Sequence, residues 1–397
     1  MKKIGILCYY QFPEGMAPTT RIIAYGKGLV RNNVETEVII FRPLHTPSNY
    51  PKEGSVEGVH YIYTHSRNRN ISRLKNIVYD KPLSVIKTIR FIKKSNRKKK
   101  YDCILLSFDN IFFMSLYITS IWFIRIPMLF IGDEYPIPIR EKLYSDIPTW
   151  KKIAYRILHQ LLRGRILMTD ALKNYYNKIA SVKPTHILPT IVDVDRFMGI
   201  QEQKANLGNP YLCYMGNMEL AKDNVDNIIR AFHILKHSPK YNQLELHLYG
   251  TPSLKDKKIL EDLINKLDMN KSVFIMGRAQ YSDVPDILAH ALVLVTSQPN
   301  TKRAEGGFPT KLGEYLLSNR PAIVTNVGEI SDYIKDGVNA YLVEPNDPEA
   351  YAKKLDYILN NPQEAIEVAK RGRAYIFDNF SCEKISADMI CFMNSLL

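Results

Sequence analysis

The chain has 397 residues, a formal net charge of +14 and a hydrophobic content of 46%, which is ordinary for a globular protein. Its length excludes a single compact domain and suits two domains of roughly 190 residues each. The five scattered cysteines form no CxxC pair and the nine histidines form no HExxH motif. We therefore expect reduced cysteines, a cytosolic protein and no metal site.

The first half of the chain alternates apolar runs with stretches of helical periodicity. Residues 3–10 predict a buried strand, 19–31 a helix and 37–41 a second strand. A strand, a helix and a strand within about 40 residues form a βαβ unit, which predicts a parallel sheet. Further strands are expected at 59–63 and 101–107.

The most apolar region, 111–131, raises the question of a membrane span. Arg125 and Pro127 divide it into a stretch of about 14 apolar residues and a short run, MLFI. Fourteen residues fall short of the ~18–20 that a bilayer requires, so we expect a helix followed by a buried strand. A polar loop, 133–136, follows that strand. Since ligands of open α/β sheets bind beyond the carboxyl ends of the strands, Asp133 and Glu134 are candidate site residues.

The remaining elements continue the alternation through the second half. We expect an α/β protein with two Rossmann-like doubly wound domains facing a central cleft. The expected divisions are 1–190, 191–375 and a C-terminal helical segment, 376–397, that packs back on the first domain. The predicted elements are helices at 150–163, 170–180, 224–236, 258–267, 284–290, 311–318, 330–335, 348–360 and 363–375, and strands at 165–169, 185–188, 211–215, 244–249, 273–276, 292–296, 322–326 and 340–343.

The stretch 305–317, EGGFPTKLGEYLL, contains glycines beside a proline, a lysine and two glutamates. It predicts a loop that feeds the N-terminus of a helix, where free N–H groups and the helix dipole attract phosphate. Glu314 would lie one turn into that helix, placed to accept hydrogen bonds from the two hydroxyls of a ribose. The alternative is a turn followed by a core helix.

The basic excess is confined to the first half. Residues 1–195 carry 31 Lys and Arg against 15 Asp and Glu, whereas the remainder carries 23 against 25. The densest run, 93–100, reads KKSNRKKK. It is typical of a segment that binds an anionic membrane or nucleic acid, or of a solvated helix end. No aromatic residues alternate with it as in nucleic-acid recognition, so we expect no nucleic-acid partner and a peripheral position at the inner face of a membrane.

Five segments of the second half resemble glycosyltransferase family 4, which has the GT-B fold. They are YMGN at 214–217 with Lys222, FIMGR at 274–278, GFPTKLGEYL at 307–316, NRPAIVT at 319–325 and Gly337 with 340–343. The segment 188–197, LPTIVDVDRF, resembles the family's linker. The first half matches more loosely, through Gly15, Arg21 and the loop 133–136.

The resemblance implies a retaining glycosyltransferase with a UDP- or GDP-linked sugar donor, no obligate metal or other cofactor, and a growing surface glycan as acceptor, carried on lipid in some cases. It implies three catalytic candidates, Glu305, Asp133 and Lys222, with Lys222 paired to the diphosphate. Arg21 and Glu134 would meet the acceptor. The implied donor-binding residues are Gly15, Gly216, Asn217, Lys222, Arg278, Gly307, Phe308, Thr310, Lys311 and Glu314.

Two positions depart from the family pattern. The family usually has Arg where this chain has Asn217, and Glu where it has Gly306, so that Glu305 stands one residue too early. A bulge at Gly306 and Gly307 would let Glu305 substitute. Two other functions fit the same motifs: a GT-B-type nucleotide-sugar epimerase, or a non-catalytic sugar-nucleotide-binding partner of another transferase.

Overall fold

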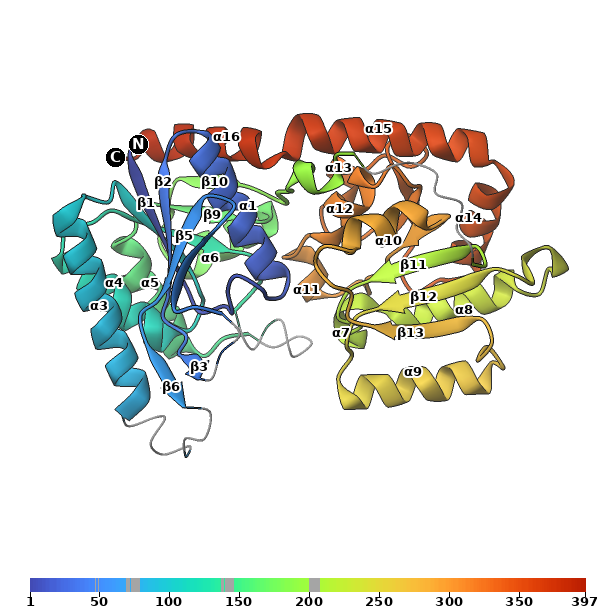
Figure 1. The fold of residues 1–397 in the computed structure, drawn as a ribbon, viewed down its shortest axis with the longest axis horizontal. Helices are drawn as coiled ribbons and strands as arrows, with labels where there is room; N and C mark the ends of the chain where they lie inside the picture. Colours follow the sequence, from blue (N-terminus) through green and yellow to red (C-terminus); the bar gives the residue numbers. More distant parts are fainter. Residues whose placement is uncertain are drawn as a thin grey trace. The chain divides into compact units, whose positions relative to one another are not determined.

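A computed structural model describes residues 1–46, 48, 50–68, 72, 79–136, 139, 146–199 and 208–397. The chain divides into two compact units (Figure 1). The first contains Met1–Ile191 and Cys382–Leu397, and the second contains Val192–Ser381. Most of the polar segment 199–210, expected next to the domain boundary, lies outside the described residues.

The first unit is built on an eight-stranded sheet in the order β10-β9-β8-β7-β1-β2-β5-β4, parallel except for β4. Helices α3 and α4 lie on one side of it and α1 on the other (Figure 1). Its elements are β1 (Lys3–Cys8), α1 (Ala17–Arg31), β2 (Glu35–Ile40), β3 (Leu44–Thr46), β4 (Glu53–Val56), β5 (Val59–Tyr63), β6 (Ser66–Asn68), α3 (Lys81–Lys98), β7 (Cys103–Ser107), α4 (Ile111–Phe123), β8 (Met128–Gly132), α5 (Thr149–Gln160), β9 (Gly164–Leu167), α6 (Asp170–Ile179), β10 (Thr185–Ile187) and α16 (Cys382–Asn394).

The second unit is built on a six-stranded parallel sheet in the order β13-β12-β11-β14-β15-β16. Its elements are the short 3₁₀ turns η2 (Val194–Phe197) and η3 (Pro239–Tyr241), β11 (Tyr211–Met215), α7 (Leu220–Asp223), α8 (Val225–Leu235), β12 (Glu245–Tyr249), α9 (Leu254–Lys266), β13 (Val273–Gly277), α10 (Val284–His290), β14 (Val293–Val295), α11 (Lys302–Glu305), α12 (Lys311–Leu317), β15 (Ala322–Thr325), α13 (Ile330–Tyr333), β16 (Tyr341–Val343), α14 (Pro348–Asn360) and α15 (Pro362–Phe380).

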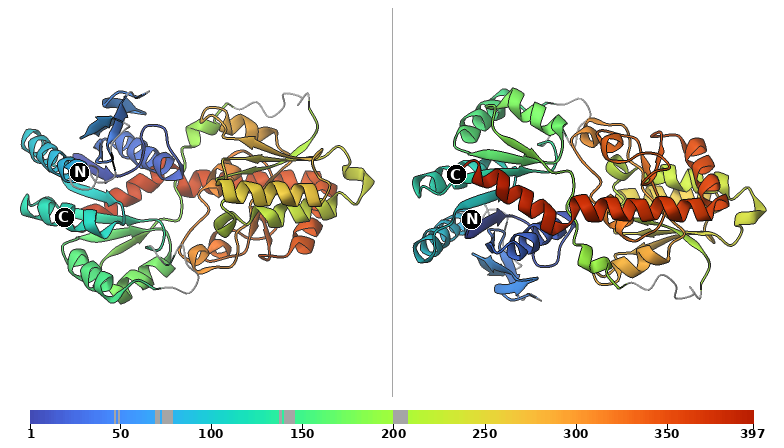
Figure 2. Two further views of the ribbon diagram at one scale, coloured as in Figure 1. Left: turned by 90° about the horizontal axis from the view of Figure 1, so that it is seen from below. Right: turned by 90° about the horizontal axis from the view of Figure 1, so that it is seen from above.

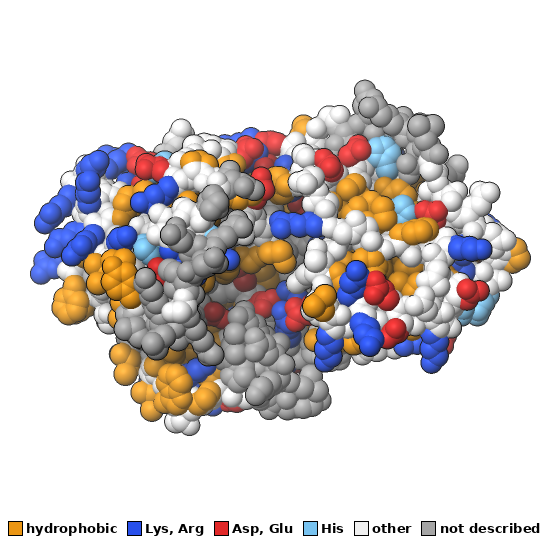
Figure 3. Space-filling model, turned by 60° about the horizontal axis from the view of Figure 1, so that its bottom comes forward, with side chains coloured by type: hydrophobic (Ala, Val, Ile, Leu, Met, Phe, Trp, Pro, Cys, Tyr) orange, Lys and Arg blue, Asp and Glu red, His pale blue; other side chains and the backbone are white. Residues whose placement is uncertain are grey.

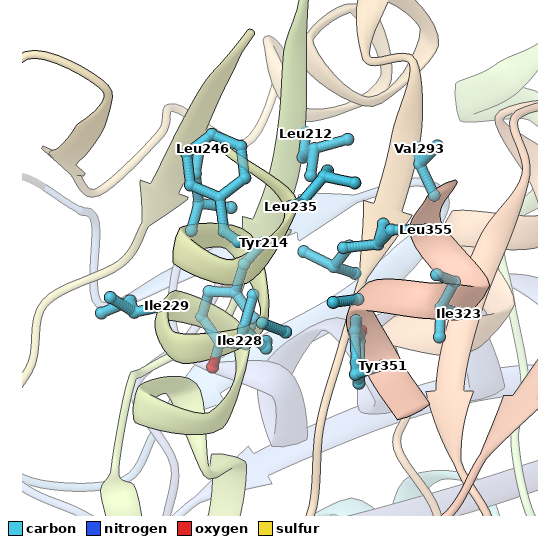
Figure 4. Packing of buried hydrophobic residues seen from close by; sticks show 14 of the residues in the cluster. Leu212, Tyr214, Ile228, Ile229, Leu235, Leu246, Val293, Ile323, Tyr351 and Leu355 are labelled. Atoms are coloured by element: carbon cyan, nitrogen blue, oxygen red, sulfur yellow. The ribbon is translucent and has the colours of Figure 1, made fainter. Parts of the chain in front are cut away.

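The core of the second unit lies between this sheet and the helices α8 and α14, which pack against each other. Figure 4 shows side chains of β11, β12, β14 and β15 meeting those of the two helices. Both faces of a parallel sheet are covered by helices, so its strands are nearly continuous apolar runs such as AIVT in β15, all four residues of which are buried. Burial of these side chains supplies the main driving force for folding.

The division of 111–131 into a helix and a strand is confirmed by α4 and β8. The helix begins at Ile111 because the Asn110 side chain accepts hydrogen bonds from the backbone N–H of Phe112 and Phe113. None of the described helices is long and apolar enough to cross a bilayer.

Several elements were missed by the sequence reasoning. Helix α3, which ends in the basic run, was not predicted, nor were the short elements β3, β4, β6, α7 and α11. Elements of three or four residues show too few periods of hydrophobic alternation to be recognised. In α3 the buried apolar residues Val85 and Ile92 stand among many basic residues, so the helical repeat of hydrophobic positions is difficult to recognise.

The C-terminal segment contains two helices that belong to different units. Residue 376, the expected start of the returning segment, lies inside α15, and the first unit resumes only at Cys382. There α16 packs against α1, and both views of Figure 2 show the two helices side by side. Gly28 permits this close packing, because a Cβ at this position would lie 2.0 Å from the Cys382 carbonyl oxygen.

We expect His159 to make the first unit less stable in mild acid. This α5 residue is completely buried, and its Nδ1 accepts a hydrogen bond of 3.0 Å from Nε of Arg165. Burial, together with the charges of Arg165 and Lys183, lowers the pKa of His159 well below its usual value of 6.5. The unfolded chain therefore binds a proton below about pH 6.5 that the folded chain rejects, and about 1.4 kcal/mol of stability is lost per pH unit.

Urea unfolding at pH 7.5 and pH 5.5 measures this loss. A His159→Asn variant keeps an acceptor near the position of Nδ1, and its unfolding free energy should fall less on acidification than that of the wild type. The exposed His237→Asn serves as the control and should behave as the wild type does. An equal pH dependence in all three proteins would show that His159 does not titrate between the folded and unfolded states.

Candidate active site

The loops after β11 and β14 meet where the strand order of the second sheet reverses. Strand β11 pairs with β12 on one side and with β14 on the other, so the crossovers leave in opposite directions at this point. The carboxyl ends of strands at such a switch point form the usual ligand site of doubly wound sheets. The loop after β11 contains Gly216, Asn217 and Lys222, and the loop after β14 leads to Lys311 and Glu314.

Two ion pairs join these loops. Arg303 of α11 donates from Nη1 to Oε1 of Glu219 at 2.6 Å and from Nη2 to Oε2 at 3.4 Å. Lys311, the first residue of α12, donates from Nζ to Oδ1 of Asp223 at 2.6 Å. The Asp223 side chain is 2% exposed and that of Lys311 is 18% exposed. Segments about 90 residues apart in sequence are thereby held at one end of the sheet.

The ammonium group of Lys311 lies in a confined polar environment. It also donates to the Tyr214 hydroxyl at 3.2 Å and lies 4.4 Å from the centre of that ring. Burial lowers the pKa of Lys311, Asp223 opposes this shift, and the charge of nearby Lys222 lowers the pKa further. The two lysines are therefore close enough to repel each other, and an added anion such as a diphosphate would relieve that repulsion.

Two glycines, Gly216 and Gly250, allow the ends of β11 and β12 to lie close together near Lys311. A Cβ at Gly216 would lie 2.6 Å from Nζ of Lys311 and 2.4 Å from the Tyr214 hydroxyl. A Cβ at Gly250, which has a φ of +143°, would lie 1.6 Å from the carbonyl oxygen of Gly216. The ends of β11 and β12 thus approach each other more closely than any other residue type would allow.

Glu314 lies in the first turn of α12 and forms an ion pair with Arg196 of η2. The guanidinium group of Arg196 also donates from Nη2 to the Tyr281 carbonyl oxygen at 2.9 Å. Its central carbon lies 3.7 Å from the centre of the Tyr281 ring, a cation–π contact. The carboxylate of Glu314 is therefore held by a cation that is itself fixed by stacking and hydrogen bonding.

Glu305 is placed at the end of a short helix instead of in a bulge. It is the last residue of α11, where it forms an ion pair with Lys302 one turn earlier, and its side chain is 44% exposed. Gly306 follows as the helix C-cap with a φ of −88°, and the N–H of Gly307 bonds to the Ala304 carbonyl oxygen at 3.3 Å.

The other predicted donor-binding residues of the second unit lie in or near the same loops. Phe308 is buried against Tyr333, and Thr310 occupies the N-cap position of α12. Gly307 and Asn217 are half-buried loop residues. Arg278 is exposed beyond β13, which β12 separates from β11.

The first unit has its own switch point between β1 and β7, and Arg21 lies beside it. Arg21 is 5% exposed and donates from Nε to the Tyr25 hydroxyl at 2.6 Å and from Nη2 to the Leu188 carbonyl oxygen at 2.8 Å. Its Nε lies 3.6 Å from Oδ1 of Asp133. Burial disfavours its charge, but Asp133 and Tyr25 raise the pKa of Arg21 overall. Its Nη1 is buried and makes no hydrogen bond to any described residue.

The two other predicted residues of this unit lie in the loops after β1 and β8. Gly15 is needed for contacts within the chain, because a Cβ there would lie 2.0 Å from Oγ1 of Thr19 and 2.7 Å from the Gln11 carbonyl oxygen. Glu134 follows Asp133 and is half-buried. The structure therefore brings Arg21 and Asp133 together, with Glu134 next in sequence.

The protein family described as glycosyl transferases group 1 matches residues 197–375 of this chain. These residues lie within the second unit. Sucrose-phosphate synthase from Thermosynechococcus elongatus superposes over 100% of this chain and 99% of its own, with a TM-score of 0.75 and 16% identity. The chain has the GT-B fold, and its second unit is a glycosyl transferases group 1 domain. The expected GT-B fold and the expected likeness of the second half to glycosyl transferases are thus confirmed.

Several known proteins resemble part or all of this chain. A Staphylococcus aureus poly(ribitol-phosphate) alpha-N-acetylglucosaminyltransferase is 29% identical over 157 residues, 39% of this chain and 30% of the relative. The putative glycosyltransferase EpsD of Bacillus subtilis is 25% identical over 41% of this chain and 39% of its own length. The chain thus spans well under half the length of these curated relatives. The crystal structure of S. aureus TarM superposes over 99% of both chains, with a TM-score of 0.70 and 14% identity.

Sequence reasoning missed the partners of the predicted residues. Asp223, Glu219 and Arg303 carry no recognisable motif, because their role depends on contacts between loops about 85 to 90 residues apart. Arg196 lies in the segment 188–197, which resembles the family's linker. It is 118 residues from Glu314 in sequence, so the sequence did not predict their ion pair. The sequence contains no local signal for Asp223, because its partner Lys311 lies 88 residues away.

Proposed function

We propose that this protein is a retaining glycosyltransferase that moves a sugar from a UDP- or GDP-linked donor to a growing surface glycan. The observation that carries the proposal is that Lys222, Lys311 and Glu314 lie on the segments that follow β11 and β14, at the switch point of the second sheet. Two cations and a carboxylate at this place suit a nucleoside diphosphate, whose charged phosphates and ribose hydroxyls need these partners.

The two lysines would stabilise the leaving group. As the bond between the sugar and the diphosphate breaks, negative charge grows on the phosphate oxygens, and preplaced cations stabilise the transition state more than the ground state. Lys311 is held in position by Asp223 and Tyr214 and so needs little rearrangement. Glu314 would accept hydrogen bonds from the ribose, and Arg278 would lie toward the base.

The solved relatives support a nucleotide-sugar donor. Anabaena HepE, a structural neighbour with a TM-score of 0.69, was crystallised with UDP and glucose, and S. aureus TarM with UDP and alpha-GlcNAc-glycerol. The name of the S. aureus curated relative describes sugar transfer to poly(ribitol-phosphate). By analogy we propose that the donor is UDP-linked and that the acceptor belongs to a surface polymer. Lipid-linked intermediates of such a polymer are the acceptors to test.

In the first unit, the proposal assigns Arg21, Asp133 and Glu134 to the acceptor and the transferred sugar. The buried Nη1 of Arg21 makes no hydrogen bond to a described residue, so it is available to donate one to a ligand. Asp133 lies beside Nε of the same side chain. Glu305 remains a candidate for contacting the sugar, although doing so requires it to leave Lys302. A non-catalytic, sugar-nucleotide-binding partner of another transferase is the second candidate, because Glu305 is engaged in this ion pair.

We propose that the protein acts in the cytoplasm, peripherally at the inner face of the membrane.

We also propose that the reaction needs no metal and no other cofactor. Within the described ranges, no group of three or more His, Cys, Asp or Glu side chains is arranged to hold a metal ion. The lysines would then supply the positive charge. Transfer in the presence of EDTA should equal transfer with added Mg²⁺, and a loss with EDTA would contradict this part of the proposal.

Thermal unfolding with a panel of UDP-, GDP- and ADP-linked sugars tests the proposal. One nucleotide class should raise the Tm. At a concentration 100 times its Kd, it should raise the free energy of unfolding by about 2.7 kcal/mol. Release of the nucleotide from that donor separates a transferase from a binding partner, and NMR of the product anomer tests retention. Stabilisation by none of the nucleotides would contradict the assigned donor site.

We expect Arg196→Ala to raise the KM for the donor about tenfold or more and to leave kcat nearly unchanged. Arg196 positions Glu314, and a hydrogen bond to a charged group contributes roughly 1.5–3 kcal/mol. Arg196→Lys should not restore the KM, because an ammonium group cannot bond to Glu314 and Tyr281 in the same fork geometry. A lower KM in Arg196→Ala would instead show that Arg196 competes with the ribose for Glu314.

A further inference from the structure

Three neighbouring helices of the first unit, α3, α4 and α5, present a surface that the transfer chemistry does not use. Helix α4 packs against both α3 and α5. We call their solvent-exposed side the α3–α4–α5 face. In Figure 3, Lys and Arg side chains gather at the left end of the molecule, with hydrophobic side chains next to them.

Helix α4 is apolar on its exposed side as well as on its buried side. Its 13 residues, IFFMSLYITSIWF, include no charged residue. Met114, Tyr117, Ile118 and Ile121 pack inward, yet Phe112, Trp122 and Phe123 are 55%, 50% and 77% exposed. Three large aromatic side chains in water on one short helix are costly, because apolar area contributes about 25 cal/mol per Å² when it is buried. Clusters of this kind usually mark an interaction site.

Helix α5 repeats the pattern beside it. Trp150, Ile153 and Ile157 are 59%, 54% and 57% exposed, and their spacing places them along one stripe of the helix. Tyr155, Leu158 and His159 occupy the opposite, buried stripe. The two neighbouring helices together therefore expose six large hydrophobic side chains.

Helix α3 adds a dense positive charge. Its 18 residues include seven lysines and arginines and no acidic residue. Ile92 and Thr88 face the core, whereas the basic side chains point to solvent. Five of them line a single open hollow: Arg90, Lys93, Lys94, Arg97 and Lys98.

We propose that the α3–α4–α5 face docks on an anionic phospholipid bilayer, with the aromatic and aliphatic side chains in the headgroup region and α3 against the lipid phosphates. This deepens the peripheral position proposed above. Its test measures lipid binding without sugar transfer, so the two proposals can fail separately.

The chemistry of the face favours a bilayer over other partners. Tryptophan and phenylalanine partition to the membrane interface, and each basic residue near an anionic surface contributes about 1 kcal/mol. A nucleic acid would engage α3 but would leave Ile153 and Ile157 in water. A two-fold dimer through this face would bring the two α3 helices into one interface, where their like charges repel.

The chain offers a direct reporter, because its only two tryptophans are Trp122 and Trp150. Both lie on the proposed face. We expect the intrinsic fluorescence to shift to shorter wavelength with vesicles of phosphatidylcholine and phosphatidylglycerol, and not with phosphatidylcholine alone. The protein should float with the anionic vesicles, and binding should fall at least tenfold at 0.5 M NaCl because salt screens the basic side chains.

Substitutions separate the two parts of the face. Lys93→Glu/Lys94→Glu should abolish binding to anionic vesicles, and Phe123→Ser/Ile153→Ser should weaken it at least tenfold. The matched controls lie in the second unit: Lys257→Glu/Lys258→Glu for charge, and Leu254→Ser for an exposed apolar side chain, 90% exposed. Both controls should bind as the wild type does.

Three results would overturn the proposal. The first is the absence of both flotation and a fluorescence shift with anionic vesicles. The second is vesicle binding that the controls reduce as much as the substitutions on the face do. The third is a shift that depends on protein concentration and needs no lipid, which would assign the face to a second copy of the chain.

Discussion

Lys311→Met should lower the stability of the second unit by on the order of 3 kcal/mol and abolish sugar transfer. The substitution leaves the Asp223 carboxylate, 2% exposed, without the cation that compensates its charge. Removing one partner of a buried ion pair costs roughly 3–5 kcal/mol, and the partial exposure of Lys311 favours the lower end. For a unit of this size the Tm should fall by roughly 6–12 °C, which calorimetry can measure.

A double variant distinguishes the two roles of Lys311. Lys311→Met/Asp223→Leu replaces the pair by apolar side chains, so most of the lost stability should return while transfer stays absent. The exposed Lys271→Met is the control for losing a lysine and should unfold at the wild-type temperature. If Lys311→Met alone unfolds at that temperature, the pair with Asp223 does not stabilise the unit.

Lys222→Ala should lower kcat by about 10²–10³-fold with little change in Tm. Lys222 is half-buried on α7 and close enough to Lys311 to influence its pKa, and Arg303–Glu219 and Lys311–Asp223 are ion pairs that join the two segments. A cation that acts on the charge of the transition state contributes roughly this much to the rate. Steady-state kinetics on the preferred donor, with the Tm measured in parallel, tests the expectation.

Two comparisons make the result for Lys222 specific. Lys222→Arg keeps a positive charge and should retain more activity than Lys222→Ala. Lys258→Ala removes an exposed lysine of α9 and should behave as the wild type does. An active Lys222→Ala would remove Lys222 from the diphosphate site and leave Lys311 as its main cation.

The sequence was most informative where a pattern repeats over many residues. The strands at 59–63 and 211–215 and the helix at 348–360 have the predicted bounds, because a local pattern marks each of them: alternation in the first strand, a continuous apolar run in the second and a helical repeat in the helix. The stretch 305–317 was recognised because its glycines, lysine and glutamate stand close together. It was less informative for α11, whose four residues show too little periodicity, and this short helix determines where Glu305 lies.

By itself, then, the sequence determined two doubly wound units, the basic first half and the loops that contain the candidate donor site. Only the tertiary structure decided how the residues of that site are paired. Asp223 holds Lys311, and Arg196 holds Glu314. A charged side chain bonds to whichever opposite charge the fold brings within about 4 Å, and for Lys311 and Glu314 that partner lies 88 and 118 residues away in sequence. No local pattern carries that information, because the crossovers between strands alone decide which loops meet.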